Sequence, residues 1–92
     1  TIPYGKGVCG KAWEEGRTLI VPDVEKFPGH IACSSLSRSE IVVPMYDSSR
    51  RFYGVLDVDS THIDDFNTDD KEGLEHIVAL LMAEVKEVTM QP

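Results

Sequence analysis

The most regular hydrophobic pattern of the chain lies in its last third. Apolar residues recur there at steps of three and four, which predicts an amphipathic helix: Leu74, Ile77, Val78, Leu81, Met82 and Val85. Either Asn67 or Thr68 can cap its start, and Asp69, Asp70 and Glu72 suit the positive end of the helix dipole. We expect this helix to pack its apolar stripe on one face of a sheet.

Two apolar, β-branched runs precede that helix and predict a β-hairpin. Residues 40–46 suit the first strand, residues 47–50 the turn, and residues 52–59 the return strand. Pro44 lies inside the first run, so we expect it at a sheet edge or at an irregular position.

The N-terminal half predicts shorter elements. Residues 8–15 suit a short helix that ends at Gly16, and residues 18–21 suit a short strand. Residues 23–39 form a long polar segment without a regular pattern, and such a loop in a small domain is usually functional or disordered. These elements predict an α+β fold, an antiparallel sheet with helices packed on one face. Because that sheet is thin, we expect further strands before residue 1 or from a partner chain.

Composition and charge narrow the functional classes. The chain has 92 residues, enough for one domain, and a net charge of −7 from 16 acids and 9 bases. This balance argues against binding to nucleic acid or to an anionic membrane, since both need a basic surface. No apolar run approaches the roughly 18 to 20 residues that span a bilayer, and no signal-peptide pattern is present. Two cysteines are too few for a disulfide-rich fold or a structural zinc site, so we expect no metal and a cytoplasmic protein with reduced thiols.

Three acids are predicted to meet on one face of the hairpin. Asp57 and Asp59 are two residues apart, so their side chains share a face of the strand. A turn centred between Ser48 and Ser49 would place Glu40 opposite Asp57, with Asp59 as its diagonal neighbour. Like charges at this spacing raise at least one pKa, which suits a bound ammonium group, a cation or a proton donor. The alternative is a set of solvated acids at a strand end.

Cys33 is the strongest candidate for chemistry, because it lies between small and hydroxylated residues in the long polar segment. A nucleophilic cysteine needs its thiolate form, and His30 and Arg38 are the nearby groups that could favour it. Either of them could instead be structural. Cys9 could act as a resolving thiol that attacks an oxidised Cys33, or it could be a small buried residue at a helix start.

Several segments of the chain carry a resemblance to a known family, in this order: residues 5–10 (GKGVCG), 21–24 (VPDV), 27–33 (FPGHIAC), 39–44 (SEIVVP) and 54–60 (GVLDVDS). Together they resemble the free methionine-R-sulfoxide reductases, oxidoreductases built on a GAF-type domain. The resemblance runs from about Gly5 to the C-terminal helix. It implies that residues 1–92 form the C-terminal portion of a GAF-type domain whose N-terminal part is absent here. A homodimer or a separately supplied N-terminal segment could complete it.

The resemblance also implies roles for individual residues. Cys33 matches the family's catalytic cysteine, Glu40, Asp57 and Asp59 match the acids of the substrate pocket, and Cys9 matches a second redox cysteine. A third cysteine of the family lies just upstream of residue 1. In the implied mechanism, a thiolate attacks the sulfoxide sulfur while one of the acids, with Glu40 and Asp59 as candidates, protonates the oxygen.

The resulting sulfenic acid becomes a disulfide, which thioredoxin reduces, so no bound cofactor is implied. Free methionine-R-sulfoxide is the implied substrate, because the remaining acids can hold its ammonium group. Such an enzyme belongs to the defence against oxidative stress. Three alternatives fit the same residues: a non-catalytic GAF module that senses a small molecule, a thiol-based redox sensor or peroxidase, and a Mg²⁺ or Mn²⁺ site on the three acids.

Overall fold

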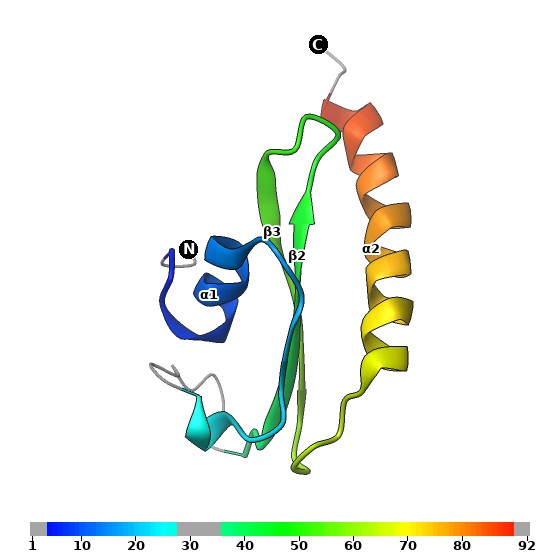
Figure 1. The fold of residues 1–92 in the computed structure, drawn as a ribbon. Helices are drawn as coiled ribbons and strands as arrows, with labels where there is room; N and C mark the ends of the chain where they lie inside the picture. Colours follow the sequence, from blue (N-terminus) through cyan, green and yellow to red (C-terminus); the bar gives the residue numbers. More distant parts are fainter. Residues whose placement is uncertain (1–3, 28–35, 90–92) are drawn as a thin grey trace.

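The structure is a computed structural model that describes residues 4–27 and 36–89, with side chains described as far as Ala83. Figure 1 shows its elements along the chain: α1 (Gly7–Glu15), β1 (Leu19–Val21), the short 3-10 helix η1 (Val24–Lys26), β2 (Ser39–Tyr46), β3 (Phe52–Ser60) and α2 (Thr68–Thr89). The predicted hairpin, both helices and the short first strand are therefore confirmed within the described residues.

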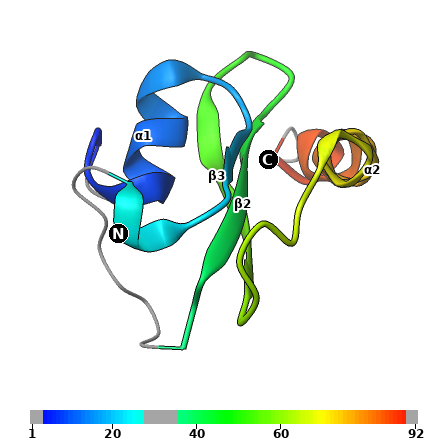
Figure 2. The same ribbon diagram turned by 60° about the horizontal axis from the view of Figure 1, so that its bottom comes forward.

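The described strands form one antiparallel sheet in the order β1-β2-β3. The two helices lie on opposite faces of this sheet, α1 on one and α2 on the other (Figures 1 and 2). The expectation that the helices share one face is wrong in this respect, although the α+β class is confirmed. The reason lies in β2, whose residues from Ser39 to Pro44 are all buried. Successive side chains of a strand point to opposite faces, so an apolar run of this kind needs a cover on each.

Each helix therefore has its own hydrophobic core. The core on the α1 side consists of six buried residues: Val8, Ala12, Leu19, Val21, Val24 and Val42. Cys9, Phe27 and Val55 are partly buried and pack against this cluster. The α2 side contains Val43, Val78 and Met82, with Met45, Leu56 and Leu74 packed against them. The predicted stripe of α2 is only partly buried, because two of its members, Ile77 and Leu81, are exposed. No helix in the described ranges combines the length and the apolar character that crossing a membrane requires.

The helix ends agree with the expected capping residues. Gly16, with φ 67°, ends α1, and its N–H donates to the carbonyls of Ala12 and Trp13. At the start of α2, Asn67 and Asp70 exchange side-chain to backbone hydrogen bonds, as in a capping box. Asn67 is therefore the cap, and Thr68 is the first helical residue.

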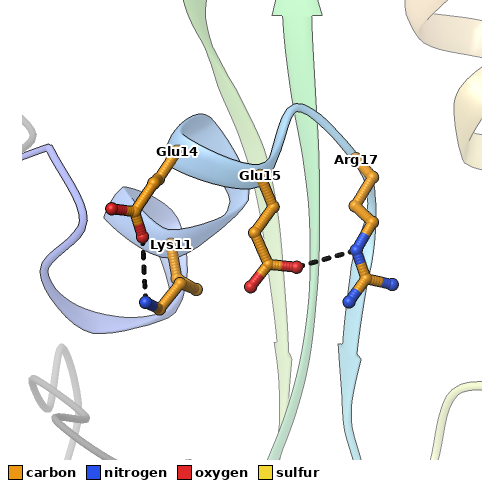
Figure 3. A network of polar contacts seen from close by, with 4 residues as sticks. All are labelled: Lys11, Glu14, Glu15 and Arg17. Carbon is orange, nitrogen blue, oxygen red and sulfur yellow. Dashed lines mark hydrogen bonds and ion pairs between the residues drawn. The ribbon is translucent and has the colours of Figure 1, made fainter.

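Two exposed ion pairs lie on the last turn of α1 and at the entry to β1 (Figure 3). Lys11 Nζ is 2.9 Å from Glu14 Oε1, and Arg17 Nε is 2.7 Å from Glu15 Oε1. Pairs as exposed as these contribute little to stability. Glu14 is therefore a suitable control residue, an exposed acid on α1 that lies apart from the acids of the hairpin.

The register of the hairpin differs from the predicted one. Glu40 lies opposite Asp59, not Asp57, and Asp57 lies opposite Val42. Two one-residue differences add up to this shift. The loop includes Arg51, whose carbonyl accepts a hydrogen bond from the Asp47 N–H, and a bulge places Tyr53 as an extra residue in β3. Since a shift of two residues restores the same face, the acids still share one side of the sheet.

Pro44 was expected at a sheet edge or at an irregular position. It lies in β2, the central strand, but at a point where β2 has no neighbour on the β1 side. The last pair between β1 and β2 joins Leu19 to Val42, so β1 has ended before it reaches Pro44. The missing N–H therefore interrupts no bond of the β1 ladder. Within the described residues β3 pairs with β2 only. The expectation of further strands stays a prediction.

Candidate active site

The acids of the hairpin lie on the α1 face, near the start of β2. Glu40 is 4% exposed and lies opposite the exposed Asp59, while Asp57 is half-buried beside it on β3. On the other side Glu40 pairs with Val21 of β1, one of the buried residues of the α1 core. The carboxyl group of Glu40 is thus surrounded by apolar side chains on one side and by two aspartates on the other.

The first turn of α1 brings a thiol to these acids. The chain enters α1 through Gly7, whose φ of 65° is a left-handed conformation that favours glycine. Cys9 follows two residues later, half-buried, and its Sγ donates a hydrogen bond to Asp57 Oδ2 at 3.5 Å. The sequence contained no signal for this contact, since the two residues are 48 positions apart and only the packing of α1 on the sheet joins them.

The environment of Glu40 changes its acidity strongly. Burial in the first place, then a hydrogen bond to Asp57 and the negative charges of Asp57 and Asp59, raise the pKa of the Glu40 carboxyl to about 9. Glu40 is therefore protonated at neutral pH, in contact with an aspartate that can accept its proton. One of the three acids thus has a raised pKa, as expected, and it is Glu40, but burial contributes more to the shift than the neighbouring charges do.

Asp57 joins the thiol to the acid and keeps one oxygen free for a further partner. Its Oδ1 atom is buried and has no hydrogen-bond partner among the described residues. One donor atom each from Cys9, Glu40 and Asp57 lies within 4.8 Å of the other two. A buried oxygen of this kind is costly unless a ligand or solvent satisfies it. The arrangement can therefore hold a cation, a positively charged amine or a shared proton.

In the sequence, Glu25 precedes and Arg38 follows the segment that carries Cys33. The Arg38 N–H donates to the Ser60 carbonyl and its own carbonyl accepts from Val24 N–H, both at 2.8 Å. Its guanidinium pairs with Glu25 at 3.4 Å on the surface. In the described structure Arg38 thus braces η1 against β3, which agrees with the structural interpretation of this residue. Cys33 and His30 lie outside the described residues, so their predicted roles stay predictions.

The chain was compared with known proteins and structures. The family model for the GAF domain matches residues 1–85. GAF domain-containing protein A of Dictyostelium discoideum is 60% identical over 87% of this chain and 50% of its own length. Free methionine-R-sulfoxide reductase of Saccharomyces cerevisiae is 48% identical over 87% of this chain and 44% of its own length.

Among solved structures, free methionine-R-sulfoxide reductase of Neisseria meningitidis in complex with its substrate is similar, with a TM-score of 0.87 and 47% identity. The match covers 97% of this chain and 54% of that one. The chain thus spans about half the length of the curated relatives it matches. Since the family model extends over nearly the whole chain and the sheet with its two helices agrees with it, this protein belongs to the GAF domain family.

Proposed function

We propose that this protein reduces free methionine-R-sulfoxide to methionine. Relatives from yeast and Neisseria that share nearly half of its residues carry this activity in their names. The observation that supports the proposal most directly is the buried, protonated Glu40 beside Asp57 and the Cys9 thiol. Sulfoxide reduction by a thiol needs a proton on the departing oxygen, and a carboxylic acid that keeps its proton at neutral pH supplies one.

The proposed reaction begins at Cys33. Its thiolate attacks the sulfoxide sulfur, and Glu40 protonates the sulfoxide oxygen. The protonated oxygen then moves from the substrate sulfur to the Cys33 sulfur, so that the S–O bond of the substrate and the new bond between the two sulfurs break while an S–O bond forms on Cys33. Methionine leaves, and Cys33 is a sulfenic acid. The substrate sulfur is reduced by two electrons, and the Cys33 sulfur is oxidised by two. Asp59 is the second candidate for the proton donor, although its exposure makes it the weaker one.

Regeneration of the thiol follows as a second proposed stage. The Cys9 thiol condenses with the sulfenic acid to a disulfide and releases water. A dithiol protein such as thioredoxin then reduces the disulfide by thiol–disulfide exchange. We place this cycle in the cytoplasm, where such reductants keep thiols reduced.

Substrate selection in this proposal rests on charge. Asp57 has a buried oxygen without a partner among the described residues, and Asp59 adds a second negative charge on the same face. An ammonium group placed between them would satisfy that oxygen and neutralise the repulsion of the acids. A methionine sulfoxide inside a peptide has no such group, so the free amino acid is the expected substrate.

The test is methionine release from four substrates, the R and S sulfoxides in free and N-acetylated form, with a thiol reductant. We expect turnover of the free R form only, and none by the Cys33→Ser variant. Glu14→Gln, which removes an exposed acid on α1, is the control that should keep the parent rate. Equal turnover by Cys33→Ser, or no turnover of any sulfoxide by the folded protein, would refute the proposal. The second outcome would favour a non-catalytic sensor module.

A further inference from the structure

A thiol and two carboxylates converge on one point between α1 and the sheet. The donor atoms of Cys9, Glu40 and Asp57 all lie within 4.8 Å of one another. They come from α1, β2 and β3, so three packed elements present them. Two donors bound to one tetrahedral zinc ion are about 3.3 to 3.8 Å apart, because each bond is about 2.0 to 2.3 Å long. The three side chains would therefore have to draw together by at most about 1.5 Å to bind a single ion.

A second observation points to a ligand at the same place. Asp57 Oδ1 is buried and has no hydrogen-bond partner among the described residues. The other oxygen of this carboxylate accepts the thiol hydrogen of Cys9. A metal ion in this position would satisfy Oδ1 and take the place of the thiol hydrogen. It would also bring positive charge to a place where the acids repel one another.

The donor set determines the class of metal. Thiolate is a soft ligand that selects zinc-like ions, whereas Mg²⁺ and Ca²⁺ prefer oxygen ligands only. We propose that Cys9, Glu40 and Asp57 form a binding site for one thiophilic divalent cation, Zn²⁺ in the first place. Three protein ligands leave a fourth tetrahedral position open. The sequence suggested a weaker Mg²⁺ or Mn²⁺ site that used Asp59. The fold places Cys9 there instead, which changes the preferred ion.

This inference does not depend on the proposed reductase reaction, because binding is measured without substrate. One consequence does rest on the proposed reductase reaction, namely that the ion inhibits turnover. The bound ion would be coordinated by Glu40, the proposed proton donor, and by Cys9, the proposed resolving thiol. Zn²⁺ should then stop turnover, and a chelator should restore it.

The first experiment is a titration of the reduced protein with Co²⁺ under anaerobic conditions. A Co²⁺–thiolate bond produces a charge-transfer absorption in the near ultraviolet. We expect this band in the parent and in Cys33→Ser, and we expect its loss in Cys9→Ser. Asp57→Asn should keep the band but weaken Zn²⁺ binding by about tenfold or more, since even the loss of an outer partner costs that much. A band that disappears in Cys33→Ser and persists in Cys9→Ser would overturn the proposal.

The second experiment needs no variant, so it holds even if a substitution prevents folding. The protein is treated with a thiol-alkylating reagent in the presence of Zn²⁺, of Mg²⁺ or of a chelator, and the modified cysteines are identified by peptide mass. Zn²⁺ should protect Cys9 from alkylation, while Mg²⁺ and the chelator should not. Equal alkylation of Cys9 under all three conditions would show that the site does not bind the ion.

Discussion

At the scale of single residues, Glu40 combines two properties that folding alone would not select. It is almost completely buried, and it faces two other acids. A buried carboxyl that must stay protonated is a cost to the fold whenever the surrounding solution would ionise it. Such residues persist where their protonation state serves a function.

Replacing Glu40 by Gln should separate stability from activity. Gln keeps the shape and hydrogen-bonding capacity but cannot ionise or donate the catalytic proton. We expect turnover to fall by about 10² to 10⁴, the usual contribution of a general acid. The free energy of unfolding at pH 8 should rise on the order of 1 to 3 kcal/mol, because the penalty of the crowded acid is removed. Denaturant unfolding and steady-state kinetics measure both. Glu14→Gln should change neither, and a marked loss of stability in Glu40→Gln alone would contradict this account.

Replacing Asp59 by Asn should act on Glu40 through charge. Asp59 is exposed, so its substitution should change the free energy of unfolding by less than about 0.5 kcal/mol. Because the negative charge of Asp59 helps to raise the pKa of Glu40, its removal should lower that pKa. The upper limb of the pH profile of turnover should therefore move to lower pH. An unchanged limb would mean that another group titrates there.

At the scale of elements, the hairpin determines which side of the sheet carries the acids. The loop and the bulge at Tyr53 together shift the register by two residues from the simple turn expected from the sequence. The face was predictable, because side chains alternate along a strand. The partner of Glu40 was not, because the bulge is a property of the closed hairpin and not of either strand alone.

Deletion of Tyr53 should remove the bulge without moving the acids. Tyr53 is the extra residue of β3, so Phe52 and Gly54 would still lie opposite Tyr46 and Met45, and the acids would keep their pairs with β2. We therefore expect the turnover rate and the midpoint of thermal unfolding to change little. Loss of turnover in a folded deletion variant would show that the bulge itself shapes the site.

At the scale of the whole molecule, the site exists only where three elements meet. α1 supplies the thiol, the hairpin supplies the acids, and the core on the α1 side keeps water from Glu40. Burial, the largest cause of the raised pKa of Glu40, requires the packed core, whereas the hydrogen bond and the charges of the two aspartates come from the hairpin itself. The dependence of folding on pH therefore reports on the assembled site.

The free energy of unfolding should decrease as the pH rises from about 4.5 to about 9. In this window the folded protein keeps the Glu40 proton, whereas the unfolded chain has lost it, so protons favour the folded state. At more acidic pH, Asp47 has the opposite effect on the free energy of unfolding. The backbone N–H of Arg51 holds the pKa of Asp47 below its usual value, so the ionised carboxylate stabilises the folded state and its protonation in acid removes that stabilisation. Denaturant unfolding across pH should show the decrease in the parent protein. The Glu40→Gln variant should show a flat upper limb, and a parallel decrease in that variant would assign the effect to another group.

The sequence alone determined the local features of this protein. Periodicity of apolar residues predicted the C-terminal helix, and the stop at Gly16 marked the end of the first helix. Two apolar, β-branched runs around a turn predicted the hairpin, and the two-residue spacing of Asp57 and Asp59 placed them on one face. These properties follow from the geometry of a helix or a strand, which the chain sets within a few residues.

Only the tertiary structure decided which groups meet. It placed α1 and α2 on opposite faces, brought Cys9 to Asp57 across 48 positions, and buried Glu40 deeply enough to raise its pKa to about 9. Contacts and desolvation of this kind depend on how distant elements pack. No local pattern of residues encodes that packing by itself.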